Sequence, residues 1–206
     1  KENLKRVYGV NDVELGALAA FYVALFAVDD AALAELENTG MLGWMAQFDL
    51  AVVACTKLGI PLTVIGAGPD HARLRRLAGK SVTFLGKVSD DDLEEEFGRA
   101  EGIIFPGLED FGITSIEAMA AGMPVIAYKA GGALDYVKPG VTGEFFEKQT
   151  AASLAKTLQQ FNGDKYSSAA IKAYATKFSK EKFAAHVKSF LIDCLKQHRT
   201  ATKNVN

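Results

Sequence analysis

Short apolar segments rich in β-branched and aromatic residues recur along the middle of the chain. Five of them start about 20 residues apart, with polar turns or amphipathic stretches between them: 61–66, 81–86, 102–106, 124–128 and 143–146. This interval fits the repeat of strand, loop, helix and loop in a parallel sheet that helices cover on both faces. The pattern therefore predicts an α/β fold with a Rossmann-like, doubly wound parallel sheet of about six strands.

The last third of the chain has a different period. Apolar residues recur there at three- and four-residue spacing, which is typical of helices, over 150–161, 167–178 and 179–198. We therefore expect a helical C-terminal part over 150–198, followed by a frayed polar tail. At 206 residues the chain has the length of one ordinary domain, so we expect 1–206 to fold as a single unit.

The regular spacing is broken once, at 17–47. The apolar run centred near Val23 precedes the next predicted strand by about twice the usual interval. We expect Ala20–Ala27 to form a strand, because its loss would expose the apolar flank of its neighbour, although its alanines suit a helix equally well. Asp30–Asn38 is expected to be a helix. An apolar cluster follows, which we expect to pack on the sheet or to contact another molecule: Met41, Leu42, Trp44 and Met45.

Composition and charge limit the function. Hydrophobic residues make up 49% and charged residues 23%, the profile of a soluble globular protein. A net charge of −2 provides no basic field for nucleic acid, which we do not expect as a partner. We expect neither a signal peptide nor a transmembrane segment, and predict a cytoplasmic location. Cys55 and Cys194 lack metal-ligand spacing and are expected to be lone buried thiols.

The stretch "PGLEDFGITSIEAMAAGMPVIA", residues 106–127, carries the candidate chemistry. Glu109 and Glu117 flank a glycine-bearing turn that leads from a predicted strand into a predicted helix. Ligands of open parallel sheets bind beyond the carboxyl ends of the strands, and the free N–H groups at a helix start suit a phosphate. Gly112 allows close approach, Glu117 could accept hydrogen bonds from vicinal hydroxyls, and Glu109 could do so from a polyol. A phosphate with sugars on both sides would satisfy these features.

Two structural readings compete with this interpretation. The segment from Thr114 to Glu117 fits a capping box, in which the glutamate binds the amide of the N-cap residue. Glu109 and Asp110 could be solvated loop charges. The residues alone leave both readings open.

A wider stretch, "FPGLEDFGITSIEAMAAGMPVIAYKAGGALDYVKPGVTGEFF", resembles the donor-binding half of retaining, nucleotide-sugar-dependent glycosyltransferases of the GT-B fold. The family is the group 1 or family 4 type, and the two glutamates match its Glu-x7-Glu motif. "PLTVIGAGPD", "VTFLGKVSDDDLEEEFGRAEGIIFP" and "YATKFSKEKFAAHVKSFL" resemble the same family at the same relative positions. The resemblance covers roughly residues 48–190, and so many ordered matches are highly specific.

The resemblance implies a role for each part of the motif. Glu117 would bind the nucleotide ribose, and Glu109 would be the catalytic residue in contact with the donor sugar. Backbone groups of the turn would hold the sugar and the diphosphate: Phe111, Gly112, Ile113 and Thr114. The base would lie against the end of the strand at 81–86: Gly86, Lys87 and Val88. The resemblance implies no metal and no cofactor, because the nucleotide-diphosphate sugar is itself the substrate.

The sequence departs from the family where the family keeps its phosphate-binding cations. The family has a Gly-Arg pair after its first strand and a lysine further on, and one such cation can be worth several powers of ten in rate. Here residues 7–56 contain no lysine or arginine. They carry seven acidic residues instead: Asp12, Glu14, Asp29, Asp30, Glu35, Glu37 and Asp49.

The resemblance also implies an N-terminal acceptor domain, which we expect to be absent from this chain. Two functions remain open at this point. The chain is either the donor-binding domain of a hexosyltransferase that retains the anomeric configuration, or a non-catalytic, natural or engineered scaffold that keeps the fold without the cations. In either case we expect the nucleotide-sugar donor to be the partner that matters, and the chain alone to be inactive.

Overall fold

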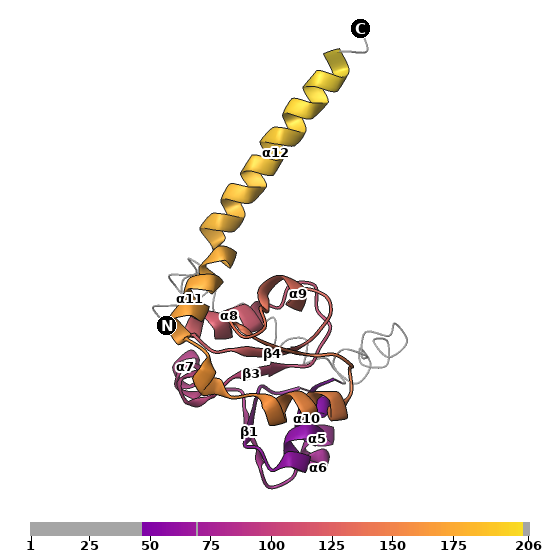
Figure 1. Ribbon diagram of the computed structural model, residues 1–206, viewed down its shortest axis with the longest axis vertical. Helices are drawn as coiled ribbons and strands as arrows, with labels where there is room; N and C mark the ends of the chain where they lie inside the picture. Colours follow the sequence, from indigo (N-terminus) through magenta and orange to yellow (C-terminus); the bar gives the residue numbers. More distant parts are fainter. Residues whose placement is uncertain (1–46, 69, 204–206) are drawn as a thin grey trace.

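The structure is a computed structural model that describes residues 47–68 and 70–203 (Figure 1). The predicted strand at Ala20–Ala27, the predicted helix at Asp30–Asn38 and the apolar cluster at 41–45 lie outside these residues. The other predicted strands and helices lie within the described residues.

Five strands form within the described residues, at the five predicted places: β1 (Leu62–Ile65), β2 (Val82–Gly86), β3 (Ile103–Phe105), β4 (Val125–Tyr128) and β5 (Gly143–Phe146). They make two hydrogen-bonded groups, β1-β2 and β3-β4-β5, and every pairing is parallel. The predicted α/β fold with parallel strands is therefore confirmed.

Helices cover both faces of the three-stranded group (Figure 1). They are α5 (Phe48–Leu58), α8 (Ile113–Ala121), α9 (Ala133–Tyr136), α10 (Ala151–Gln160) and α11 (Ser168–Ala175). Alternate residues of a strand point to opposite faces. Accordingly, Val125 and Ala127 of β4 pack with α8, α9 and α11, whereas Ile126 packs with α5 and α10. Both faces are thus apolar, as a doubly wound sheet requires.

Short helices and turns complete the domain: α6 (His71–Leu77), α7 (Asp90–Arg99), η1 (Gly163–Lys165) and η2 (Thr176–Phe178). Helix α7 begins with a capping box, in which Ser89 Oγ accepts from Asp92 N at 3.2 Å and the Asp92 carboxylate accepts from Ser89 N. Helix α8 ends at Gly122, whose φ of 95° suits the left-handed C-cap predicted there.

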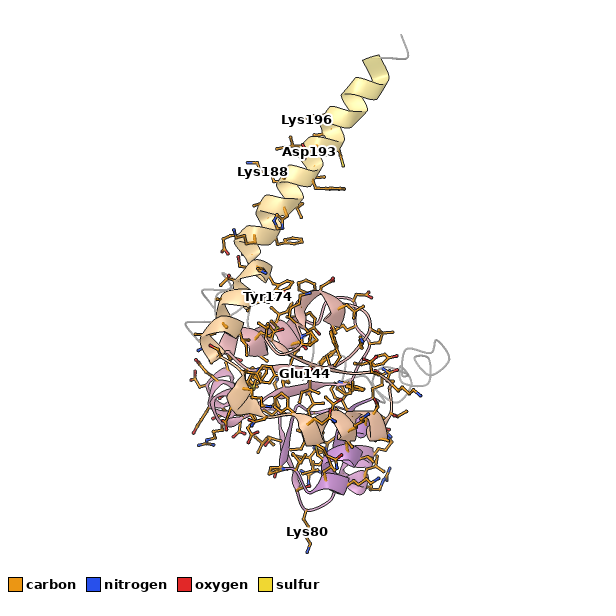
Figure 2. All side chains as sticks on the ribbon, in the orientation of Figure 1. Lys80, Glu144, Tyr174, Lys188, Asp193 and Lys196 are labelled. Carbon is orange, nitrogen blue, oxygen red and sulfur yellow. The ribbon has the colours of Figure 1, made fainter. Side chains whose placement is uncertain are left out.

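The last helix, α12 (Lys180–Lys203), projects away from the domain (Figure 1). Figure 2 shows Lys188, Asp193 and Lys196 on its distant part. Large apolar side chains on it are exposed: Phe183, Val187, Phe190, Leu191 and Leu195. The predicted end at 198 was too early, because no glycine or proline follows to stop the helix. Among the described helices, none has the length and apolar character needed to span a bilayer.

The two cysteines differ in their surroundings. Cys55 of α5 is buried, as predicted, and burial raises the pKa of its thiol to about 11. Cys194 is exposed, so the prediction of a second buried thiol is wrong. The reason is that Cys194 lies on α12, where the helix has left the domain.

This architecture predicts that substitutions of two large apolar residues change the free energy of unfolding by very different amounts. Ile171 of α11 is fully buried against α8, whereas the Phe190 side chain on α12 is 67% exposed. Ile171→Ala should lower the free energy of unfolding by about 2 to 5 kcal/mol, because it leaves a cavity. Phe190→Ala should change it by less than about 0.5 kcal/mol. Urea unfolding measures both, and a large loss for Phe190→Ala would contradict the exposed position of α12.

Candidate functional site

The candidate site lies where the chain leaves β3 and enters α8. The turn between them ends at Gly112, the N-cap of α8, which has a φ of 79° and a ψ of 52°. This left-handed conformation favours glycine. A Cβ at this position would also lie 2.5 Å from the hydroxyl oxygen of Tyr136. Both constraints make the glycine in this turn necessary.

The start of α8 has no side-chain cap, and its first turn carries no acidic residue. The first intrahelical bond runs from Ile116 N to Gly112 O, so the amides of the residues before Ile116 have no partner within the helix. The capping-box reading is wrong, because the helix begins at Ile113 and places Thr114 inside it. An uncapped helix start with its partial positive charge suits an anion.

Glu117 lies one turn into α8 and is partly buried. Its carboxylate makes no hydrogen bond or ion pair with any residue that the structure describes. Burial, with a smaller contribution from the charge of Asp90 at the start of α7, raises the pKa of Glu117 to about 7. A buried carboxyl without a partner is costly for the fold and is common in functional sites.

Glu109 lies on the other side of the turn and is also partly buried. Its Oε2 atom is buried and has no hydrogen-bond partner among the described residues. Burial raises the pKa of Glu109, and the neighbouring charge of Asp110 adds to the effect. The reading as a solvated loop charge therefore fits Asp110, which is exposed, but does not fit Glu109.

The residues predicted to face the base follow β2. Gly86 ends the strand with a φ of 70°, Lys87 is exposed and Val88 is partly buried. They precede α7, which packs beside α8, and Asp90 of α7 acts on Glu117. The structure therefore brings this segment close to Glu117, although the segment follows β2 and Glu117 lies on the helix after β3.

Two lysines lie near this edge of the sheet. Lys129 follows β4, but its Nζ contacts Glu147 Oε1 at 2.6 Å in an ion pair. Lys87 makes no ion pair within the part of the chain that the structure describes. Of these two, Lys87 is thus the one whose charge is not already matched by a carboxylate.

Sequence reasoning missed the residues that support the turn. Tyr136 reaches Gly112 from α9, and the side chain of Gln47 accepts a hydrogen bond from Leu108 N at 3.0 Å. The glycine pair at 131–132 was a usable signal. A Cβ on Gly132 would lie 2.3 Å from the carbonyl oxygen of Asp110, so adjacent glycines mark a close approach of two backbones.

Comparison with known families and proteins adds a second line of evidence. The family model described as "Glycosyl transferases group 1" matches residues 39–178. A GDP-mannose-dependent alpha-(1-6)-phosphatidylinositol monomannoside mannosyltransferase from Mycobacterium tuberculosis is 37% identical over 98 residues, which cover 41% of this chain and 26% of that protein. An uncharacterized glycosyltransferase from Methanocaldococcus jannaschii is 37% identical over 100 residues, covering 46% and 26%.

Solved structures with a similar fold include a glycosyltransferase and a sucrose-phosphate synthase. A glycosyltransferase from Rickettsia africae superposes with a TM-score of 0.62 at 24% identity, covering 74% of this chain and 45% of that one. A sucrose-phosphate synthase from Thermosynechococcus elongatus gives a TM-score of 0.58 at 25% identity, covering 72% and 42%. The matched region spans about a quarter of the length of the two curated relatives and less than half of these two structures.

The raised pKa of Glu117 predicts how stability depends on pH. An unfolded glutamate loses its proton near pH 4.5, whereas Glu117 in the folded protein keeps it until about pH 7. The folded state therefore binds more protons between these values, and stability falls as the pH rises, by at most about 1.4 kcal/mol per pH unit.

Urea unfolding between pH 4 and pH 8 tests this expectation. Glu117→Gln cannot titrate and should lack this part of the slope, so the variant should gain stability relative to the wild type as the pH rises. Parallel pH profiles for the two proteins would contradict the assignment.

Proposed function

Because this chain belongs to the group 1 glycosyltransferases, we propose that it is the donor-binding domain of a retaining hexosyltransferase, one half of a GT-B fold. The domain would hold a nucleotide-diphosphate sugar at the uncapped start of α8. The observation that carries the proposal is the unpaired, partly buried carboxylate of Glu117 beside that helix start. A carboxylate, free amides and a second carboxyl at Glu109 match ribose, diphosphate and sugar in that order.

Each part of the site would bind a different part of the donor. Glu117 would accept hydrogen bonds from the ribose hydroxyls, and the amides of Ile113 and Thr114 would bind the diphosphate. Glu109 and the backbone of Phe111 and Gly112 would contact the sugar. The base would lie against the segment after β2: Gly86, Lys87 and Val88.

The reaction we propose for the intact enzyme breaks the bond between the anomeric carbon and the diphosphate oxygen. The acceptor oxygen attacks from the face that the diphosphate leaves, which retains the configuration, and its proton passes to the leaving diphosphate. The partial positive charge at the start of α8 would stabilise the charge that develops on that group. Glu109 would orient the sugar during this exchange.

The acceptor site would come from a second domain of the intact enzyme. We therefore propose that the chain binds donor but transfers no sugar alone, and that its affinity is low, because Lys129 is already paired with Glu147. No observation on the described residues favours the alternative of a non-catalytic scaffold.

A nucleotide screen tests the proposed function. UDP, GDP, ADP and their sugars should be compared by thermal shift and by calorimetry, with GDP-mannose included because one relative is named for it. We expect one nucleotide class to bind with a dissociation constant weaker than about 100 μM, or −5.5 kcal/mol. At 50 times that constant it would raise the free energy of unfolding by about 2.3 kcal/mol. The absence of any shift at millimolar concentrations would refute donor binding.

Glu117→Gln tests the residue that carries the proposal. Replacing the carboxylate should weaken nucleotide binding by about 1.5 to 3 kcal/mol, because a charge-assisted hydrogen bond is lost. Wild-type affinity should also rise as the pH increases through 7, because only the ionised carboxylate accepts both hydroxyls. Calorimetry at pH 6 and pH 8 measures both effects.

The matched control is Glu101→Gln. Glu101 is exposed and lies just before β3, at the end of the strand opposite the site. This variant should bind nucleotide as the wild type does. Equal losses for the two variants would mean that Glu117 has no specific contact with the ligand.

A further inference from the structure

The loop after β4 lies directly against the turn that carries Glu109. The amide of Gly132 donates to the carbonyl oxygen of Glu109 at 2.7 Å. A Cβ on Gly131 would lie 2.6 Å from that same oxygen. The two backbones are therefore in contact, and the position of Glu109 depends on the segment that begins at Gly131.

That segment continues into α9, whose last residue is Tyr136. The Tyr136 side chain is 1% exposed and lies under Gly112. A Cβ on Gly112 would lie 2.5 Å from the Tyr136 hydroxyl oxygen and 2.9 Å from the ring atoms Cε1 and Cζ. Gly112, the left-handed N-cap residue of α8, is thus in close contact with the phenol ring of Tyr136.

The phenol belongs to a small group of buried polar atoms. Burial is the main reason why the pKa of Tyr136 is raised to about 12; the hydroxyl of Ser115 limits this rise, and the charge of the Glu109 carboxyl contributes to it. Neither the hydroxyl of Ser115 nor Oε2 of Glu109 is within hydrogen-bonding geometry of any described group. Within the described part of the chain, Oε2 of Glu109 thus lacks a hydrogen-bond partner, which is costly unless a ligand or water supplies one.

Hydrogen bonds to its backbone and to that of its neighbours hold Tyr136 in place. The hydroxyl of Thr142 donates to the carbonyl oxygen of Tyr136 at 2.9 Å and accepts from Lys138 N at 2.7 Å. The hydroxyl of Tyr174, on α11, donates to the carbonyl oxygen of Asp135 at 3.3 Å. These contacts fix α9 relative to the rest of the domain, so its phenol ring has a defined position.

We infer that Tyr136 is a positioning residue of the donor site, which holds Gly112 in place and with it the turn that carries Glu109. The inference rests on the proposed function. It assigns Tyr136 an influence on sugar binding that a residue serving only the core would not have. A core role needs the ring alone, whereas the support of Gly112 also involves the hydroxyl, whose oxygen is the atom that would lie nearest to a Cβ there.

Tyr136→Phe separates these roles, because it removes the hydroxyl and keeps the ring. The measurement is the ratio of the dissociation constants for a nucleotide and its sugar, with GDP against GDP-mannose and UDP against UDP-glucose. We expect this ratio to fall by at least about five-fold, while the affinity for the nucleotide alone changes by less than about two-fold. Tyr166→Phe is the control, because its hydroxyl contacts Glu144 at 2.7 Å, away from Glu109, and the ratio should stay unchanged.

A thermal-denaturation cycle tests the support of Gly112 without any ligand. Gly112→Ala should lower the melting temperature by at least about 4 °C more in the wild-type background than in Tyr136→Leu. The cost of the positive φ is common to both backgrounds, whereas the clash with the phenol is present only in the first. If Tyr136→Leu does not fold, Tyr136→Phe serves as the second background, because it removes the closest atom.

The outcomes distinguish this inference from the proposed function. Nucleotide binding with an unchanged sugar ratio in Tyr136→Phe, or with no preference for the sugar in the wild type, overturns the inference and leaves donor binding intact. Binding of no nucleotide refutes the proposed function, and the cycle then decides whether Tyr136 supports the turn. Equal effects of Gly112→Ala in both backgrounds overturn that support.

Discussion

The hydrogen bond from Gly132 N to Glu109 O joins the two loops on which the candidate site depends. Parallel pairing of β3 and β4 brings the carboxyl ends of both strands to one edge, and the loops that follow them meet there. Without side chains at residues 131 and 132 the two backbones approach closely enough to bond. The turn then ends at Gly112 over the ring of Tyr136, and α8 begins with its amides uncapped.

The electrostatics of the site follow from this geometry. Glu109 and Glu117 are both placed where burial raises the pKa of a carboxyl, and the nearest charges, Asp110 and Asp90, are acidic as well. Among the described residues no cation pairs with either of them. Such an arrangement opposes the stability of the empty protein and favours a ligand rich in hydroxyl groups, because these groups donate to the carboxylates.

Two lysines lie near the edge of the sheet at which the candidate site lies. Lys129 is paired with Glu147, and Lys87 is exposed. The amides at the start of α8 are therefore the main positive groups at the site, with Lys87 at its margin. In the function we propose, much of the binding energy of the donor would therefore depend on backbone groups.

The sequence by itself determined the class of fold, five of its strands and the stretch that contains the site. Hydrophobic period and turn residues are local properties of the sequence. They were therefore enough to predict the strand at 124–128, the end of the helix at Gly122 and the helices of the last third. Tertiary structure alone decided which groups lie unpaired. The sequence allowed a capping box at Thr114, buried thiols at both cysteines and a solvated Glu109. Contacts between distant segments settled these points. Tyr136 packs against Gly112 before α8, Asp90 acts on Glu117, and α12 projects from the domain and so leaves Cys194 exposed. No local pattern in the sequence records such contacts.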